Sequence, residues 1–262
     1  MVGKTLASEQ AQPGLRIYLA GGLALADSEG ATVGERAFAG RQGRRLFVRL
    51  AATHEPVPSV DLADDLWGTR WPPTWHASLR SLVSKLRLVL ARVGAADIVS
   101  STNATYAMVL PAGSWLDIEA AAEEVHRAEA ALAAGDHAEA GAAALIARSI
   151  ASRTLLPGEE GEWLDLLRDR LADVRLRALE CLGEVWIARG DPALAARDAA
   201  EAIRVDPYRE SAHRLLMRAH VAAGDRGAAA HAFEVCKRVL AEELGVAPSA
   251  ETVALAATVL RS

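Results

Sequence analysis

Hydrophobic positions between Thr74 and Val93 recur at helical spacing. When this segment is placed on a helix at about 100° per residue, seven apolar residues gather on one side: Leu79, Leu82, Val83, Leu86, Val89, Leu90 and Val93. A stripe of this width predicts a helix that packs against a core. The opposite side carries small residues along its middle, with one large exception, and these are Ala77, Ser81, Ser84, Ala91 and the exception Leu88.

The two edges of this outward side are basic. Arg80 and Arg87 lie two turns apart on one edge, and Lys85 and Arg92 lie two turns apart on the other. A helix in the major groove of DNA has a phosphate strand on each side and base edges beneath it. Small central residues allow close approach, and flanking Arg and Lys reach the phosphates. The pattern therefore favours a DNA-binding helix over an ordinary solvated face.

The distribution of charge along the chain supports this interpretation. No acidic residue lies between Asp65 and Asp97, a span with five basic residues, although the formal net charge of the 262-residue chain is −5. The first 115 residues hold 12 of the 29 basic residues but only 9 of the 34 acidic ones. Opposite charge in the two halves predicts two domains with different partners, and nucleic acid is the leading partner of the first.

The elements around the basic helix predict a small mixed domain. In chain order we expect two strands within 15–25, a strand within 31–38, a helix at 41–53, an extended piece at 57–59, a helix at 60–67 and a hairpin of strands 98–100 and 106–110. Ser59 and Thr74 are expected to cap the helices that follow them. This order is typical of a winged helix-turn-helix of the OmpR/PhoB type over residues 15–115. Residues 1–14 are polar and small and are expected to be disordered.

From Leu116 onward the apolar pattern is helical throughout. A long periodic stretch from Trp163 to Arg189 ends at Gly190-Asp191, and another helix ends 34 residues later at Gly224-Asp225. This period, with small residues after a glycine turn, is typical of tetratricopeptide (TPR) repeats. We therefore expect about seven helices in a TPR-like superhelical stack over residues 116–262. The predicted fold class is mainly α with a small β component.

Nothing in the sequence indicates catalysis, a metal site or a cofactor site. Gly3-Lys4-Thr5 resembles the end of a phosphate-binding loop but lacks the upstream glycine, and the histidines lack metal-ligand spacing. Cys181 and Cys236 lie in helical patterns and are expected to be buried, reduced thiols. The N-terminus has no signal-peptide core, and no apolar run reaches membrane length. We expect a cytoplasmic, nucleoid-associated protein that is not an enzyme and has no membrane partner.

Motifs in both halves resemble the SARP family, the AfsR-type transcriptional regulators of actinobacteria. Members join an OmpR/PhoB-like winged helix to a bacterial transcriptional activator domain (BTAD). In the first half the similar segments are GRQGRRLFVRLA, PVPSVDLADDLW and SLRSLVSKLRLVL, and in the second half they are GEWLDLLRDRLADVRLRALECL and the long run from DPYRE to LAEELGVAPSAET. The resemblance covers residues 15–261 and implies a winged helix at 15–115 followed by a BTAD at 116–262.

The resemblance implies a sequence-specific regulator, more often an activator, that binds double-stranded promoter DNA as a homodimer and contacts RNA polymerase. The residues expected to meet DNA are Ala77, Arg80, Ser81, Ser84, Lys85, Arg87 and Arg92 on the helix and Thr102 and Asn103 on the wing. The loop expected to contact polymerase contains Gly68, Thr69, Arg70 and Trp71. The helical domain is a candidate site for a small-molecule or protein effector.

Two departures from the family leave a second interpretation open. The wing SSTNAT has no Lys or Arg, and Leu82 and Leu88 stand where relatives place polar or basic residues. Fewer phosphate contacts predict weaker binding and a shallower dependence on salt. The alternative is a TPR-type adaptor whose winged helix no longer reads DNA, or needs a partner or an effector to do so. Salt-dependent binding to duplex DNA distinguishes the two functions.

Overall fold

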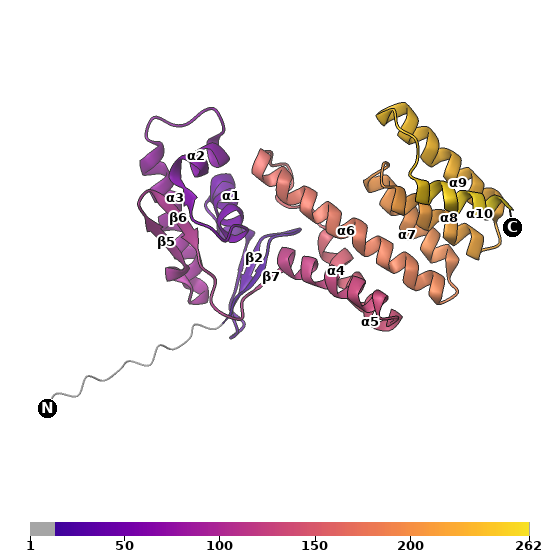
Figure 1. The fold of residues 1–262 in the computed structure, drawn as a ribbon. Coiled ribbons are helices and arrows are strands. Elements are labelled where there is room, and N and C mark those ends of the chain that lie inside the picture. The colour runs from indigo at the N-terminus through magenta and orange to yellow at the C-terminus, as the bar shows by residue number, and fades with distance from the viewer. Residues whose placement is uncertain (1–13, 262) are drawn as a thin grey trace. The chain divides into compact units, whose positions relative to one another are not determined.

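The computed structural model describes residues 14–261, which form two compact units (Figure 1). Unit 1 contains the described residues up to Glu119 together with Thr154–Arg168, and unit 2 contains Ala120–Arg153 and the residues from Asp169 onward. The described residues are mainly helical with a few short strands, as the sequence predicted. The expectation of disorder at residues 1–14 falls almost entirely outside the described residues.

Unit 1 consists of two small sheets, three α-helices and short single turns of 3-10 helix. Its elements in chain order are β1 (Arg16–Tyr18), β2 (Ala24–Ala26), β3 (Thr32–Gly34), η1 (Glu35–Ala37), α1 (Gly40–Ala51), β4 (Val57–Pro58), α2 (Ser59–Trp67), α3 (Trp75–Leu90), η2 (Ala91–Val93), η3 (Ala96–Ile98), β5 (Val99–Thr102), β6 (Thr105–Met108) and β7 (Trp115–Leu116). The order of strands, helices and hairpin agrees with the prediction, with boundaries that differ by a few residues. No local pattern in the sequence indicates β7.

The two sheets have different topologies. The first has the order β3-β2-β1-β7, in which β1 pairs antiparallel with β2 but parallel with β7, so that Ile17 stands opposite both Leu25 and Leu116. The second is the antiparallel sheet β4-β6-β5, whose hairpin joins Thr102 to Thr105. Strand β7 was missed because its partner lies about a hundred residues earlier in the chain, and a two-residue strand has no periodicity of its own.

The apolar stripe of α3 is buried, as predicted. Leu79, Val83 and Leu86 are at most 3% exposed, and Leu90 is fully buried. Leu82 is only half-buried. From α1, Leu46, Phe47 and Leu50 enter the core, and Phe47 stacks on Phe38 with 4.7 Å between ring centroids. Burial of this stripe fixes which side of α3 faces outward.

The two predicted helix caps differ from the structure. Ser59 is the first residue of α2, with Pro58 at the N-cap position, and Thr74 stands at the N-cap of α3 without a side-chain hydrogen bond. The backbone N–H of Ser59 instead donates to the carbonyl of Ala104 at 2.8 Å. The prediction that Ser59 caps α2 is therefore wrong, because a tertiary partner from the hairpin ties down the start of this helix.

Residues 154–168 come from the second half of the sequence but pack with unit 1. Leu155 forms an isolated β-bridge with Ala20, and the N–H of Gly21 donates to the carbonyl of Thr154 at 3.0 Å. The guanidinium of Arg168 donates to the carbonyls of Leu155, Leu156 and Glu159, each within 3.3 Å. These bonds fold the segment into a compact loop, so unit 1 is assembled from two separate stretches of chain.

Unit 2 is built from paired helices, and α4 and α6 begin in unit 1 and continue into it. The helices of the second half are α4 (Asp117–Ala133), α5 (His137–Ala151), α6 (Glu162–Ala188), α7 (Pro192–Val205), α8 (Glu210–Ala222), α9 (Arg226–Val239) and α10 (Ala250–Arg261), with one π-helical turn, η4 (Leu240–Leu244). Among the described residues these are seven α-helices, which agrees with the number expected.

The three Gly-Asp turns of the second half have one geometry. Gly135, Gly190 and Gly224 adopt φ values of 77°, 80° and 77°. In each case the following Asp donates its backbone N–H to the carbonyl five residues earlier, as at Asp191 and Trp186 (2.9 Å). This is the Schellman arrangement, in which a left-handed glycine closes a helix. Gly190 and Gly224, 34 residues apart, therefore end successive helices in the same way.

Small side chains allow the helices of unit 2 to approach closely. The repeat-related pair Ala195 and Ala229 are both fully buried, and α6 approaches α8 at Gly183, where a Cβ would lie 2.3 Å from the side chain of Leu215. The high alanine content therefore reflects close packing of helices in the interior of this unit.

Candidate nucleic-acid interface

The outward side of α3 carries the residues predicted to meet DNA. Ala77, Arg80, Ser81, Ser84 and Lys85 are all exposed, because the buried stripe lies on the opposite side of the helix. At 1.5 Å per residue the 16-residue helix is about 24 Å long. The face therefore has small residues along its middle and long cationic side chains at its edges.

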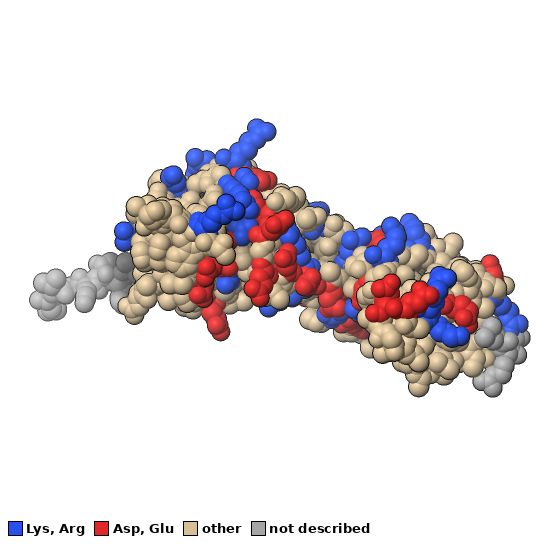
Figure 2. Space-filling model, turned by 90° about the horizontal axis from the view of Figure 1, so that it is seen from above, with Lys and Arg blue, Asp and Glu red and all other residues tan. Residues whose placement is uncertain are grey.

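The cations of this face are not neutralised by neighbouring acids. In the described part of the chain, Arg80, Lys85 and Arg92 form no ion pair. In unit 2, by contrast, Arg148, Arg177 and Arg218 are paired with glutamates, and Figure 2 shows acidic and basic side chains next to one another there. Unpaired cations on one helix face leave a positive surface that a polyanion can neutralise.

Arg87 has a different environment from the other predicted DNA residues. It is half-buried, and its guanidinium donates to the carbonyl of Val99 through Nε (3.1 Å) and Nη2 (2.8 Å). Val99 begins β5, so Arg87 fixes the start of the hairpin against α3. Its observed contact is structural, and the sequence pattern alone did not distinguish it from Arg80.

Arg92 lies beyond the end of α3, in η2. It lines a shallow depression together with Arg36 of η1 and Arg44 of α1. Arg44 is paired with Glu35 at 3.3 Å. The structure therefore groups Arg92 with basic residues from the start of the chain as well as with α3.

The hairpin β5–β6 has a tight two-residue turn. Asn103 and Ala104 have φ values of 50° and 59°, and Thr102 pairs with Thr105 on either side of them. Two consecutive positive φ values identify a type I′ turn. The hydroxyl of Thr105 donates to the carbonyl of Thr102 at 2.6 Å. Thr102 and Asn103 are both exposed.

The loop between α2 and α3 is exposed except at one anchor. Gly68, Thr69 and Arg70 are exposed, and Gly68 has a φ of 59°. Trp71 is half-buried: its indole N–H donates to the carboxylate of Asp64 at 3.1 Å, and its ring meets that of Trp75 edge-on at 4.9 Å. The anchor holds the loop against both helices and leaves Arg70 free to reach a partner.

A buried arginine, Arg45, holds the end of α2, from which this loop begins. The guanidinium of Arg45 is 5% exposed and donates to the carbonyl of Asp65 near the end of α2, to the carboxylate of Glu159 (3.1 Å) and to the carbonyl of Glu160 (2.7 Å). It also lies over the ring of Trp163 at 5.5 Å. The carbonyl of Asp65 is one of those that a helix end leaves without an internal partner. Arg45 therefore joins α1, the end of α2 and the 154–168 segment.

The neighbours of Arg45 on the same face of α1 extend this cluster. Arg41 pairs with Glu159 at 2.6 Å, and Arg49 pairs with the carboxylate of Asp65, also at 2.6 Å. Burial raises the pKa of Asp65, and the hydrogen bond from Arg49 opposes the shift. The spacing of Arg41, Arg45 and Arg49 at four-residue intervals was visible in the sequence. Nothing local indicated that Glu159, the partner of Arg41 and Arg45, lies more than a hundred residues away.

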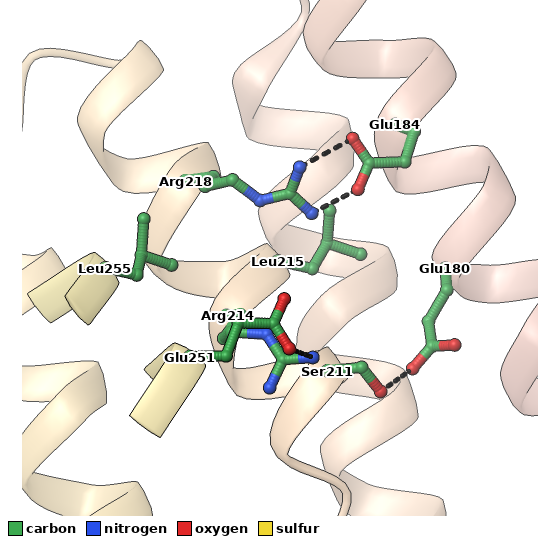
Figure 3. Close-up of a pocket in the computed structure, with 8 residues that line it drawn as sticks. All are labelled: Glu180, Glu184, Ser211, Arg214, Leu215, Arg218, Glu251 and Leu255. Atoms are coloured by element: carbon green, nitrogen blue, oxygen red, sulfur yellow. Dashed lines mark hydrogen bonds and ion pairs between the residues drawn. The ribbon is translucent and has the colours of Figure 1, made fainter. Parts of the chain in front are cut away.

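Unit 2 contains a groove that is a second candidate site (Figure 3). It encloses about 420 Å³ between α6, α8 and α10, and its residues are Glu180, Glu184, Ser211, Arg214, Leu215, Arg218, Glu251 and Leu255. Arg218 reaches across to Glu184, and Ser211 donates to Glu180 at 2.5 Å. Each arginine of the groove is paired with a glutamate, so the walls are charged but locally neutral.

No group of three or more His, Cys, Asp or Glu within the described residues is arranged to hold a metal ion. Cys181 and Cys236 are free and buried, as predicted, and burial raises the pKa of their thiols to about 12 and about 11. Within the same residues, every helix is too short or too polar to cross a membrane.

Residues 116–260 match the family described as the bacterial transcriptional activator domain. The chain belongs to this family. The match covers more than half of the sequence and confirms the resemblance to SARP-type regulators. The match begins at residue 116, whereas the packing of the structure assigns residues 154–168 to unit 1.

Two regulators and one solved structure are similar to the chain. It is 30% identical over 209 residues to the regulatory protein AfsR of Streptomyces griseus and 31% identical over 188 residues to AfsR of Streptomyces coelicolor, matches that cover 77% and 72% of the chain. The chain spans about a fifth of the length of these relatives (20% and 18%). The structure of Mycobacterium tuberculosis EmbR in complex with a low-affinity phosphopeptide is 23% identical, with a TM-score of 0.83 over 94% of this chain and 65% of that one. This last likeness establishes a shared fold.

Proposed function

We propose that this chain is a sequence-specific, DNA-binding transcriptional regulator and that it acts as an activator. Unit 1 is a winged helix-turn-helix in this proposal, with α3 as the recognition helix and the β5–β6 hairpin as the wing. The observation that carries it is the outward face of α3, where Arg80 and Lys85 are exposed on either side of small residues and form no ion pair with any described residue. Membership in a transcriptional activator family supports the same function.

The residues of the outward face of α3 differ in side-chain length and in the part of the DNA that they would contact. Ala77, Ser81 and Ser84 are short and lie along the middle, so they allow base edges to approach and offer two hydroxyls for hydrogen bonds. Arg80 and Lys85 stand at the edges, where they meet phosphates or the outer base edges. Arg92 extends the basic edge beyond the helix, and Arg87 acts mainly by holding β5. Thr102 and Asn103 present polar groups without charge to the adjacent backbone.

Three partners beyond DNA belong to this proposal. The loop of Gly68, Thr69, Arg70 and Trp71 contacts RNA polymerase, which its exposure and its anchor at Trp71 support. The chain acts as a homodimer on repeated half-sites, which a sedimentation experiment with and without DNA measures. The groove of unit 2 in Figure 3 accommodates a small-molecule or protein effector.

Salt-dependent binding to duplex DNA tests the central claim. The full chain is titrated against duplexes selected from a randomised library, at several salt concentrations between about 50 and 300 mM. We expect the logarithm of the affinity to fall linearly with the logarithm of salt concentration, because phosphate contacts release counterions. Replacement of Lys85 by Gln should make the slope shallower by about 1 if this residue contacts a phosphate.

The alternative function is that of a protein-binding adaptor. The salt titration of duplex binding distinguishes it from the regulator. The locally neutral groove of unit 2 and the uncharged wing favour an adaptor that binds protein alone. Such a protein would retain no duplex even at the lowest salt concentration. That result would overturn the regulator proposal, whereas retention that weakens steadily with salt would overturn the adaptor proposal.

A further inference from the structure

Leu88 does not match the surface on which it lies. Its side chain is 70% exposed, more than any other large hydrophobic residue whose exposure the described part of the chain provides, and it stands on α3 among small and basic residues. Isolated apolar residues on a surface usually have no specific role. Leu88 differs from these because of its place on the proposed recognition face.

The position of Leu88 is central on that face. Ala77, Ser81, Ser84 and Leu88 are separated by four, three and four residues, so at 100° per residue they form one line along the helix. The cations Arg80 and Lys85 flank this line. A duplex whose phosphates meet these two cations therefore brings base edges against the line itself. Leucine is the longest of the four side chains and would reach the base edges first.

The chemistry of the major groove restricts what Leu88 can contact. Base edges there present hydrogen-bond donors and acceptors, and the only apolar group is the C5 methyl of thymine. A leucine side chain has no donor or acceptor, so it would leave the polar groups of the other base edges without partners. Against a thymine methyl it buries apolar surface on both sides at no such cost.

We propose that Leu88 is a specificity-determining residue that selects thymine, through contact with the C5 methyl group, at one position of each half-site. The inference rests on the proposed DNA-binding function and adds a base preference to it. It also gives a physical reason for a leucine in the middle of a face whose cations stand at the edges. An apolar side chain at this place adds a preference between bases and contributes no charge-based affinity for DNA of any sequence.

Replacement of thymine by deoxyuridine tests this directly, because it removes only the methyl group and preserves base pairing. Duplexes selected by the full chain are prepared with each thymine replaced in turn, and affinities are measured by fluorescence anisotropy. We expect one replacement per half-site to weaken binding about fourfold, the effect of one buried methyl group. The Leu88→Ala variant should bind the thymine and deoxyuridine forms equally at that position.

A second variant provides the matched control. Val109 is also in unit 1 and is 68% exposed, but it follows β6 and lies outside α3. Val109→Ala should show the same fourfold methyl effect as the unchanged chain. Both variants remove exposed apolar atoms, so circular dichroism should show the native helix content in each.

The possible outcomes separate the inference from the function on which it rests. Salt-dependent binding with no methyl effect, or with equal effects in the unchanged chain and Leu88→Ala, would overturn the role of Leu88 and keep the DNA-binding function. Leu88→Ala that preserves the methyl effect but prevents self-association would show that Leu88 is a protein contact. Absence of duplex binding at low salt would overturn both.

Discussion

At the scale of single residues, the structure places individual side chains in conformations or contacts that their type alone does not predict. Ala104 adopts a φ of 59° in the two-residue turn after Asn103. This left-handed region is unfavourable for residues with a Cβ, and type I′ turns prefer glycine at the second position. The backbone carbonyl of Ala104 also binds Ser59, so the turn has to keep this strained shape.

The Ala104→Gly variant should therefore be more stable than the unchanged chain. We expect the free energy of unfolding of unit 1 to rise by about 0.5–1 kcal/mol, since glycine relieves the strain at positive φ and loses part of the gain to its greater freedom in the unfolded state. Urea unfolding monitored by fluorescence measures the change. A loss of stability would contradict the assigned turn.

Arg80 is the residue of the proposed interface with the clearest individual prediction. Arg80→Ala should weaken binding to a selected duplex by about 1–3 kcal/mol if the guanidinium reads a base, and less if it meets a phosphate only. Arg16→Ala removes the same charge from an exposed site on β1 and should have little effect. Equal affinities for the unchanged chain and Arg80→Ala would remove Arg80 from the interface.

At the scale of secondary-structure elements, the close approach of α6 and α8 depends on Gly183. This glycine lies inside a helix, where it disfavours helix formation by about 1 kcal/mol relative to alanine. A Cβ at this position would nevertheless lie 2.3, 2.9 and 3.0 Å from three atoms of Leu215, which is only 1% exposed. Contact with a neighbouring helix therefore outweighs local propensity here.

Gly183→Ala should lower the free energy of unfolding of unit 2 by about 1–3 kcal/mol, because overpacking displaces Leu215. Gly227 on α9 is the matched control, since an added Cβ there would have the carboxylate of Asp225 as its nearest neighbour, at 3.5 Å. Gly227→Ala should stabilise by about 0.5 kcal/mol. Denaturant unfolding of both variants gives the comparison, and equal gains in stability would contradict the tight contact at Gly183.

The ion pair between α4 and α6 makes the stability of unit 2 depend on pH. Arg177 donates to both oxygens of Glu129, at 2.7 and 2.6 Å. The hydrogen bond and charge of Arg177 lower the pKa of Glu129, against the opposing effect of burial. A carboxyl whose pKa is lower in the folded state contributes stability above its unfolded value of about 4.3, and this is lost as the pH falls through the folded value.

Glu129→Gln should therefore lower the stability of unit 2 at pH 7 but not at pH 3. The loss should stay below about 1 kcal/mol, since Glu129 is 41% exposed and solvent screens the pair. Urea unfolding at the two pH values measures the difference. Glu123→Gln changes an exposed glutamate of the same helix and should have little effect at either pH. A loss of equal size at pH 3 would point to packing in place of charge.

At the scale of the whole chain, unit 1 depends on a segment from the second half of the sequence. Arg45 is buried between the carbonyl of Asp65, the carboxylate of Glu159 and the ring of Trp163. A truncated chain that ends at residue 115 would lack two of these three partners. Unit 1, to which we assign DNA binding, therefore includes residues 154–168.

Arg45→Leu should lower the free energy of unfolding of unit 1 by about 1–3 kcal/mol, because the carbonyls of Asp65 and Glu160 lose their donor and Glu159 keeps only Arg41. Hydrogen exchange at residues 154–163 should accelerate at the same time. Arg44 is the neighbouring control: it pairs at 3.3 Å with Glu35, which is 49% exposed. Arg44→Leu should cost less than about 1 kcal/mol. Comparable losses in the two variants would contradict the central place of Arg45.

Local, repeating information in the sequence was enough for the helices and for the candidate DNA face. The apolar stripe of Leu79, Val83, Leu86 and Leu90 decided which side of α3 is buried, and the Gly-Asp pairs marked the ends of helices, because both depend on residues within a few positions of one another. The absence of acids between Asp65 and Asp97 identified the positive surface for the same reason.

Only the tertiary structure decided where long-range partners meet. It paired β7 with β1, tied the start of α2 to Ala104, directed Arg87 to the carbonyl of Val99 and buried Arg45 against Glu159. In the sequence, Arg80, Arg87 and Arg45 are chemically identical. They differ in the acceptors that the folded chain brings within about 3 Å of each guanidinium. A local pattern does not specify contacts between residues a hundred positions apart.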